Sequence, residues 1–162
     1  MIVISDTSPL LNLAIIGHLE LLRALYGEIV IPQSVYHELV LSGTGMPGSE
    51  DIQTATWIVV KPVKNRSLVT SLRLQLDEGE AEAIALATEL SADLLLLDER
   101  KARVVAAQFG LKFTGLLGFL VEAKHKQRLV AIKPVLDALL HQASFWVSTA
   151  LYKHILEEVG EG

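Results

Sequence analysis

The sequence contains no cysteine, so the chain can form neither a disulfide bond nor a thiolate-bound metal site. It also lacks a long apolar segment. Hydrophobic residues make up 51% of its 162 residues, yet uninterrupted runs such as Leu94–Leu97 fall far short of the roughly 20 residues that cross a membrane. No basic region precedes a hydrophobic leader, because Asp6 interrupts the first apolar run. We therefore expect a cytoplasmic protein with no membrane association.

An excess of basic residues is absent too, since the net charge is -5. The segment from Glu99 to Lys133 nevertheless holds eight basic and two acidic residues; with 14 basic and 19 acidic residues in the chain, 6 and 17 remain elsewhere. A basic segment that begins where acidic residues end is expected if a metal ion and a phosphate backbone meet there. Ordinary surface charges on helices explain the same pattern equally well.

Several familiar catalytic and ligand-binding motifs are missing. The five histidines show no HExxH spacing, and the chain has neither a P-loop nor a GxGxxG motif after its first apolar run. Ser8 has no basic partner nearby in sequence, which argues against a serine nucleophile. Trp57, Phe145 and Trp146 form no aromatic ladder for a single strand, and we expect them to pack in the core.

Short apolar runs alternate with helical patterns along the whole chain. Continuous apolar strands between helices are typical of an α/β protein, with a mainly parallel sheet covered by helices on both faces. The length suits a single domain over residues 1–162, with a helical C-terminal part from about residue 131. The clearest loop is predicted at 42–48. We expect strands at 2–5, 28–32, 57–60, 93–97 and 111–114, and helices near 9–17, 19–26, 33–41, 49–55, 80–90, 99–109, 116–126, 134–143 and 149–159.

Two aspartates each end an apolar strand, Asp6 after the first and Asp98 after the fourth. In open parallel sheets, ligands bind beyond the carboxyl ends of the strands, so we expect both carboxylates at that edge. Each aspartate also precedes a helix and could instead be a simple N-cap. Two aspartates in equivalent positions favour a site.

Three glutamates on predicted helices are further candidates. Glu38 lies about a turn and a half beyond the second strand, where an ordinary surface role is the alternative. Glu80 and Glu82 lie in an alanine-rich helix that can approach the sheet closely. Because residues two apart on a helix point about 200° apart, these two cannot share a face. An acidic first turn that matches the helix dipole explains one of them without any function.

With these acidic positions and their surroundings, the chain resembles the PIN-domain family, in particular a subgroup of uncharacterised prokaryotic PIN-like proteins predicted to bind nucleic acid. The similarity covers nearly the whole chain, and its acidic motifs occur in the expected order. The segments that carry it are residues 4–10, 31–39, 79–87, 96–103 and 114–118, with 123–124.

The resemblance implies a three-layer α/β/α sandwich and cleavage of RNA that depends on Mg²⁺ or Mn²⁺. Its acidic positions carry over to Asp6, Glu38, Glu80 and Asp98, with Glu82 as an additional candidate ligand; many relatives have an aspartate where Glu80 stands. Hard divalent cations prefer such oxygen ligands, and carboxylates crowded together without a cation would raise one another's pKa. The remaining candidates, expected to bind or support the substrate, are Ser8, Arg100, Lys101 and Arg103.

The sequence thus predicts a metal-dependent endoribonuclease. The resemblance alone implies that it is the toxin of a toxin–antitoxin pair, with an RNA substrate and a small antitoxin partner; we also expect a homo-oligomer, in particular a dimer. The apolar residues at 135–147 could supply a dimer or antitoxin surface, or be buried in the chain's own core. The alternatives are an inactive PIN-like binding or interaction module, because fold does not fix function, and a phosphatase. The phosphatase has less support, because Asp6 is followed by Thr7-Ser8 rather than by a second aspartate two residues on.

Overall fold

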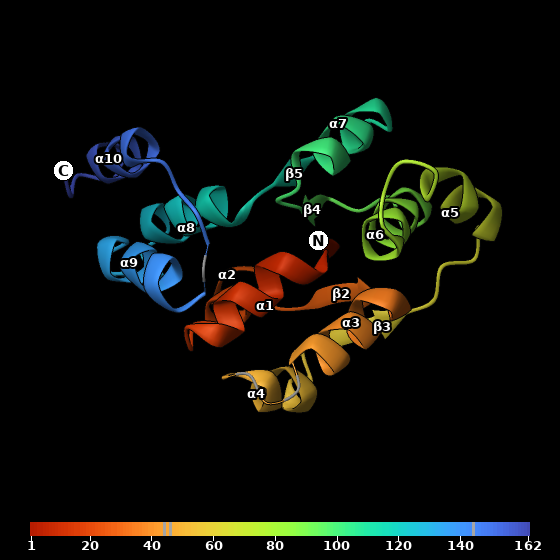
Figure 1. Cartoon of the computed structure of the whole chain (residues 1–162), viewed down its shortest axis with the longest axis horizontal. Coiled ribbons are helices and arrows are strands. Elements are labelled where there is room, and N and C mark those ends of the chain that lie inside the picture. The colour runs from red at the N-terminus through yellow and green to blue at the C-terminus, as the bar shows by residue number, and fades with distance from the viewer. Residues whose placement is uncertain (44, 46, 144) are drawn as a thin grey trace.

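The computed structural model of the chain describes residues 1–43, 45, 47–143 and 145–162, and Figure 1 shows their arrangement. The described strands form one sheet in the order β3-β2-β1-β4-β5, and every neighbouring pair is parallel. The expected parallel sheet is therefore confirmed. The strands are β1 (Val3–Ser5), β2 (Ile29–Pro32), β3 (Ile58–Lys61), β4 (Leu94–Leu96) and β5 (Phe113–Thr114).

Ten helices surround this sheet in the described part of the chain. They are α1 (Thr7–Ile15), α2 (Glu20–Tyr26), α3 (Gln33–Gly43), α4 (Ser49–Thr54), α5 (Arg66–Leu72), α6 (Glu78–Glu89), α7 (Arg100–Gln108), α8 (Leu116–His125), α9 (Lys133–Gln142) and α10 (Thr149–Glu158). Of the loop predicted at 42–48, residues 44 and 46 lie outside the described residues, and α3 continues to Gly43. None of the described helices has the length and apolar character needed to cross a membrane.

Two hydrophobic cores lie on opposite faces of the sheet, because successive side chains of a strand point to opposite faces. Val3 of β1 joins the core formed with α1, α2, α3 and α8–α10, whereas Ile4 joins the core formed with α5–α7. Figure 1 shows α5–α7 on one side of the strands and α8–α10 on the other. The three-layer α/β/α architecture expected from the sequence is confirmed.

The C-terminal helices pack on the first of these cores. Val135, Leu136 and Leu139 of α9 are buried there, so the chain's own core accounts for much of the apolar stretch at 135–147. Core packing is also confirmed for Trp57, which is 9% exposed. It is wrong for Trp146, which lies in the α9–α10 connection and is 82% exposed.

The strand order places a topological switch point between β1 and β4. The chain runs outward from β1 through β2 to β3 on one side, and from β4 to β5 on the other. Connections therefore diverge at the carboxyl ends of β1 and β4, which leaves a crevice where ligands of open α/β sheets bind. Asp6 directly follows β1, and its backbone N–H donates to the Leu96 carbonyl of β4 at 3.0 Å, so Asp6 and Asp98 emerge side by side.

Candidate active site

A pocket of about 350 Å³ lies over this switch point, and we name it the acidic pocket. Six carboxylates from separate parts of the chain line it, and no lysine or arginine is among its described lining residues. The structure thus brings Asp6, Glu38, Glu80 and Asp98 together, as predicted. The lining residues are Asp6, Thr7, Ser8, Leu11, Asn12, Glu38, Asp77, Glu80, Asp98 and Glu99.

Asp6 and Glu80 are the most deeply buried carboxylates of the acidic pocket, and each is 7% exposed. Asp6 occupies the N-cap position of α1, but its side chain makes no capping hydrogen bond, so capping does not explain the presence of this residue. Burial raises the pKa of Asp6 to about 7; a hydrogen bond from the Thr7 backbone opposes the rise, and the charges of Asp77, Glu80 and Glu38 add to it. The carboxylate is therefore held in surroundings that disfavour its own negative charge.

Asp98 is held by one oxygen and leaves the other without a partner. Its Oδ1 accepts from the Leu116 backbone N–H of α8 at 2.9 Å and lies 3.6 Å from the Arg103 Nη2. Its Oδ2 is buried and has no hydrogen-bond partner among the described residues. Burial raises the pKa of Asp98, whereas the Leu116 hydrogen bond and the Arg103 charge oppose the rise. A buried carboxylate oxygen with no partner is unfavourable unless something else binds it.

Glu38 is oriented by a hydroxyl that the sequence analysis missed. The Thr7 Oγ1 donates to the Glu38 Oε2 at 2.8 Å, which links α1 to α3 across the pocket. Gly79 of α6 makes room for this carboxylate, since a Cβ at position 79 would lie 3.1 Å from the Glu38 Oε2 and 3.4 Å from the Asp6 Oδ1. The missing side chain at Gly79 is therefore what lets α6 approach two acids at once.

Glu80 belongs to a capping box with Asp77 at the start of α6. The Glu80 backbone N–H donates to the Asp77 Oδ1 at 2.8 Å, and the Asp77 backbone N–H donates to the Glu80 Oε1 at 3.1 Å. Burial raises the pKa of Glu80, and the Asp77 backbone hydrogen bond opposes the rise. Asp77 also lines the acidic pocket, and its Asp-x-x-Glu spacing with Glu80 was the sequence signal that could have revealed it.

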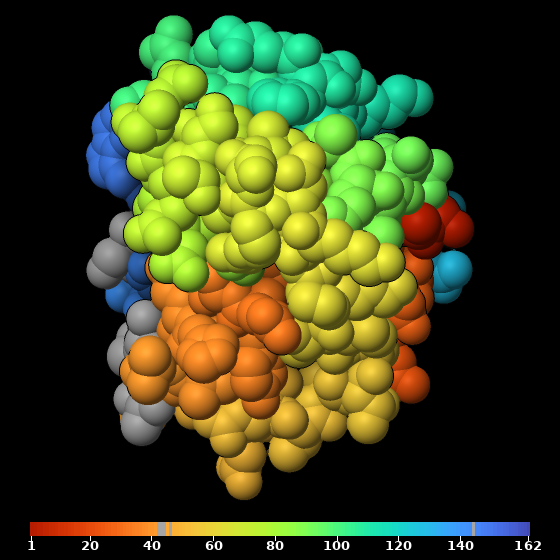
Figure 2. Space-filling view, turned by 90° about the vertical axis from the view of Figure 1, so that its right-hand side faces the viewer, coloured from red at the N-terminus to blue at the C-terminus, as the bar shows by residue number. Residues whose placement is uncertain are grey.

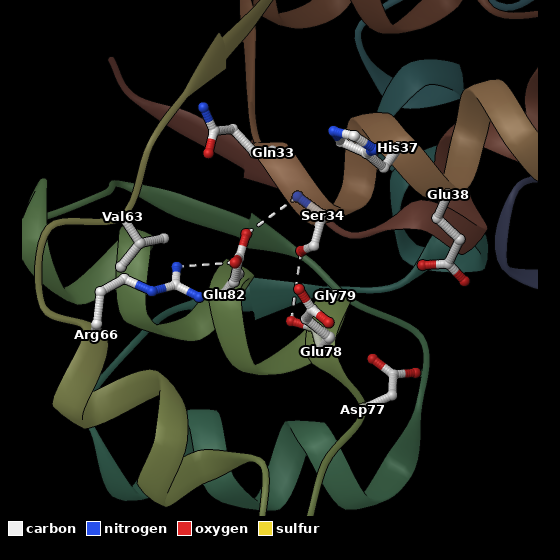
Figure 3. A pocket seen from close by; sticks show the side chains of 10 residues that line it. All are labelled: Gln33, Ser34, His37, Glu38, Val63, Arg66, Asp77, Glu78, Gly79 and Glu82. Atoms are coloured by element: carbon white, nitrogen blue, oxygen red, sulfur yellow. Dashed lines mark hydrogen bonds and ion pairs between the residues drawn. The ribbon is translucent and has the colours of Figure 1, made fainter.

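Glu82 does not line the acidic pocket. It accepts from the Arg66 Nη1 at 2.9 Å and from the Ser34 backbone N–H at 3.1 Å, and Figure 3 shows it between these two residues, away from Glu38 and Asp77. Burial favours a higher pKa for Glu82, but these hydrogen bonds outweigh it and hold the pKa below its ordinary value. The structure therefore gives Glu82 an ion-pair partner and places it in the Arg66 pocket, which Glu38 also lines, rather than in the acidic pocket.

The candidate substrate-binding residues lie at different distances from the acids. Ser8 lines the acidic pocket, and its Oγ accepts from the Asn12 Nδ2 at 3.2 Å. Arg103 pairs with Asp98 from outside this pocket, and its Nε donates to the Leu97 carbonyl at 2.7 Å. Arg100 and Lys101 are exposed in the first turn of α7 and line none of the pockets described here.

Two further pockets adjoin the acidic pocket. The Arg66 pocket, of about 720 Å³, lies between α3, α5 and α6 and shares Glu38 and Asp77 with it. In Figure 2 the surface of α3 (orange) meets that of the segment around α5 (yellow) on this face. A second neighbour, which we name the aromatic pocket, has a volume of about 430 Å³ and shares Asp98 with the acidic pocket. Its lining residues are Asp98, Arg103, Phe113, Thr114, Gly115, Leu117, Gly118 and Phe145. The acidic pocket thus shares lining residues with both of the others, and we call the three adjoining pockets together the groove.

The chemistry of the acidic pocket fits a hard divalent cation. Its charged groups all offer carboxylate oxygens, the ligands that Mg²⁺ and Mn²⁺ prefer, and the free Asp98 Oδ2 is an oxygen in need of a partner. Within the described residues, no three acidic or imidazole side chains are close enough to enclose a metal ion as they stand. The fit is thus one of charge and donor type.

Comparison with known proteins identifies a family. A family model described as a PIN domain matches residues 2–161 of the chain. No curated protein matches it.

Proposed function

The chain belongs to the PIN-domain family, and on that premise we propose that it is a divalent-metal-dependent endoribonuclease. PIN domains are generally nucleases. The observation that carries the proposal is the convergence of six carboxylates on the switch point, with no basic residue among the described residues that line their pocket. Asp6 and Glu80 are buried and Asp98 is partly buried, so this concentration of negative charge is costly unless a cation neutralises it.

In this proposal the carboxylates of the acidic pocket would hold Mg²⁺ or Mn²⁺, which would polarise the phosphodiester and make water acidic enough to attack the phosphorus, so that one P–O bond of the RNA chain breaks. Asp6 and Asp98 bind the cation directly, because one is buried with a raised pKa and the other keeps an oxygen free. Glu38 and Glu80 bind it directly or through water, with Thr7 and Asp77 fixing their orientation.

The basic residues at the start of α7 are proposed to act on the phosphate chain. Arg103 pairs with Asp98 through Nη2 and donates to the Leu97 carbonyl through Nε, and it also lines the aromatic pocket, where its guanidinium group can donate to a phosphate oxygen. Arg100 and Lys101 are exposed one turn earlier in α7, and their positive charges attract the phosphate backbone of the RNA. Ser8 supports the acids from α1.

Cleavage of a circular single-stranded RNA tests this function, because only an endonuclease opens a circle. We expect the wild-type protein to linearise it with Mn²⁺ and to be inactive in EDTA. Asp6→Asn and Asp98→Asn should each reduce the rate at least roughly 100-fold, as removal of one transition-state-stabilising group does in other enzymes.

Asp51→Asn serves as the matched control, since Asp51 is exposed on α4 and lines a separate pocket; its rate should not change. If the wild-type protein opens no RNA with either metal ion while it binds RNA as tightly as Asp6→Asn does, the chain is a binding module and the enzyme proposal is wrong.

We further propose that the protein is the toxin of a toxin–antitoxin pair, with a small antitoxin as its partner and a homodimer as its active form. Family membership alone supports this role. Induced expression in a bacterial host should arrest growth, and both Asp6→Asn and co-expression of the neighbouring open reading frame should restore it. Normal growth on strong expression of active enzyme would contradict the toxin role.

A further inference from the structure

The aromatic pocket adjoins the acids, and apart from Arg103 and Asp98 its lining residues have no part in the chemistry proposed so far. Two aromatic residues from different parts of the chain line it: Phe113 on β5, and Phe145 in the connection between α9 and α10. Phe113 packs against one hydrophobic core and Phe145 against the other, so each ring has firm support behind it. We propose that this pocket is the subsite for one nucleobase of a single-stranded RNA, beside the phosphate that is cleaved. The proposal rests on the ribonuclease function above.

The position of the pocket favours a nucleotide as its occupant. Asp98 lines both the aromatic and the acidic pocket, so a phosphodiester held at the acids has a neighbouring nucleotide at the entrance to the aromatic pocket. RNA-binding proteins commonly read single-stranded segments by stacking unpaired bases on aromatic rings and arginine planes. Here both are present, because the Arg103 guanidinium carbon lies 5.8 Å from the centre of the Phe113 ring.

Polar groups at the pocket wall suit the edge of a base. Thr114 contributes a hydroxyl whose bond to the Gly115 carbonyl is long, at 3.5 Å, and Arg103 contributes guanidinium N–H groups. Two glycines keep this wall open. A Cβ at Gly115 would collide with the Arg103 Nη2, and a Cβ at Gly118 would collide with the Thr114 Oγ1. The pocket therefore pairs apolar ring faces with hydrogen-bonding groups, as a base does.

Binding of a labelled oligonucleotide tests the subsite without turnover. In the Asp6→Asn background with Mn²⁺, fluorescence anisotropy gives the Kd of a single-stranded oligoribonucleotide. Phe145→Ala should raise this Kd roughly 5- to 150-fold, the range that corresponds to loss of one base–aromatic stack. Phe145→Leu removes the ring but keeps most of the apolar volume, so it should also raise the Kd. It replaces Phe145→Ala in the experiment if the alanine variant folds poorly.

Phe109→Ala provides the matched control, because Phe109 lies at the end of α7, is 38% exposed and lines none of these pockets. Its Kd should equal that of the parent, and calorimetry should show unchanged Mn²⁺ affinity for the Phe145 variants. An abasic nucleotide moved along the RNA should weaken binding at one position only. At that position Phe145→Ala should have little further effect, because the base and the ring are lost together.

Equal Kd values for Phe145→Ala and Phe109→Ala, or fully additive effects of Phe145→Ala and the abasic nucleotide, would overturn the subsite. The two proposals fail in different ways. If the wild-type protein does not cleave RNA but the anisotropy pattern holds, the ribonuclease proposal is wrong and the base-binding pocket stands. If the wild-type protein cleaves RNA and Phe145→Ala matches Phe109→Ala, the ribonuclease proposal stands and the base-binding pocket is rejected.

Discussion

At the residue scale, the buried Asp6 side chain carries a large part of the free-energy cost of placing negative charge in the acidic pocket. Burial at the end of β1 raises its pKa from 3.8 to about 7, so the folded protein without metal prefers the protonated carboxyl group. The stabilising contribution of that preference is complete below about pH 4 and is lost as the pH rises through about 7. A cation bound beside the carboxylate reverses this preference.

Asp6→Asn should therefore stabilise the metal-free protein at pH 8, by on the order of 1–3 kcal/mol, because asparagine has the same shape and carries no charge. Near pH 4 the gain should disappear, since the aspartate is then protonated. Urea denaturation in EDTA at both pH values measures the difference. The control Asp51→Asn should change stability little at either pH, and an equal gain from Asp6→Asn at both would show that burial of charge is not the cause.

A second residue-scale consequence concerns Gly79. Its replacement by alanine should change the free energy of unfolding by less than about 1 kcal/mol, because alanine is a good helix former and the backbone there is helical. The added methyl group would lie among the oxygens of Glu38 and Asp6, however, where the cation is proposed to bind. We expect Mn²⁺ affinity to fall roughly 10-fold, as it does when groups around a metal site are displaced.

Calorimetric titration with Mn²⁺, together with urea denaturation, separates these two effects of Gly79→Ala. Unchanged affinity in a normally stable variant would mean that the cation, if it binds, lies away from α6.

At the scale of elements, Glu161 ties three C-terminal helices together. Its carboxylate accepts from the backbone N–H groups of Ile132 and Lys133 at 2.7 and 3.1 Å, and from the Lys124 Nζ at 3.0 Å. Burial favours a higher pKa for Glu161, but these partners outweigh it and lower the pKa. Its contribution to stability is thus present above the ordinary value of 4.5 and is lost as the pH falls through the lowered value.

Glu161→Gln should reduce the free energy of unfolding by about 1–3 kcal/mol at pH 7, because it removes charge from a set of charge-assisted hydrogen bonds. The reduction should shrink on acidification to pH 3. Glu157→Gln on the exposed side of α10 is the control, with little change at either pH. Denaturation curves that coincide for both variants would show that Glu161 is not a tie between helices.

The elements themselves were largely predictable from the sequence. Apolar runs mark the strands, and the regular alternation with helices leads directly to a covered parallel sheet. The helix α5 was missed, although Asn65 is a competent N-cap whose side chain accepts from the Leu68 backbone N–H, and Val69 and Leu72 have helical spacing. The prediction that Glu80 and Glu82 face different ways, made from helix periodicity alone, agrees with their separate pockets.

What escaped prediction depends on contacts between distant segments. The Thr7 hydroxyl that orients Glu38, the space at Gly79 and the approach of Phe145 to Phe113 all need the packed structure. The ion pair between Arg66 and Glu82 also could not be predicted, because the two residues are far apart in the sequence and meet only in the packed structure. Sequence patterns fix which face a residue lies on, whereas side-chain partners follow from tertiary packing.

At the scale of the whole molecule, the net charge of -5 sets the character of RNA binding. Arginine and lysine are scarce along the groove: among the described lining residues of its three pockets only Arg66 and Arg103 carry these charges. Release of counterions from single strands contributes a slope of about −0.7 per neutralised phosphate to log K against log salt. If only Arg66 and Arg103 each neutralise one phosphate, the plot of log K against log salt should have a shallow slope of about −1.4.

Participation of Arg100 and Lys101 would steepen this slope to about −2.8. Measurement of RNA affinity across a salt series, for the parent and for the double variant Arg100→Gln with Lys101→Gln, decides between the two values. A steep slope that the double variant returns to the shallow value would assign both residues to the phosphate backbone. Equal slopes for the parent and the double variant would show that Arg100 and Lys101 do not contact the RNA phosphates.

The pairing of β1 with β4 has a consequence for how the acidic pocket comes into existence during synthesis. A ribosome that has released the chain through α6 has already made Asp6, Glu38, Asp77 and Glu80, yet β4 and Asp98 are still to come. Until β4 pairs with β1, Asp98 is not held beside Asp6. If the chain is the ribonuclease proposed above, it would therefore remain inactive until β4 and Asp98 have been synthesised.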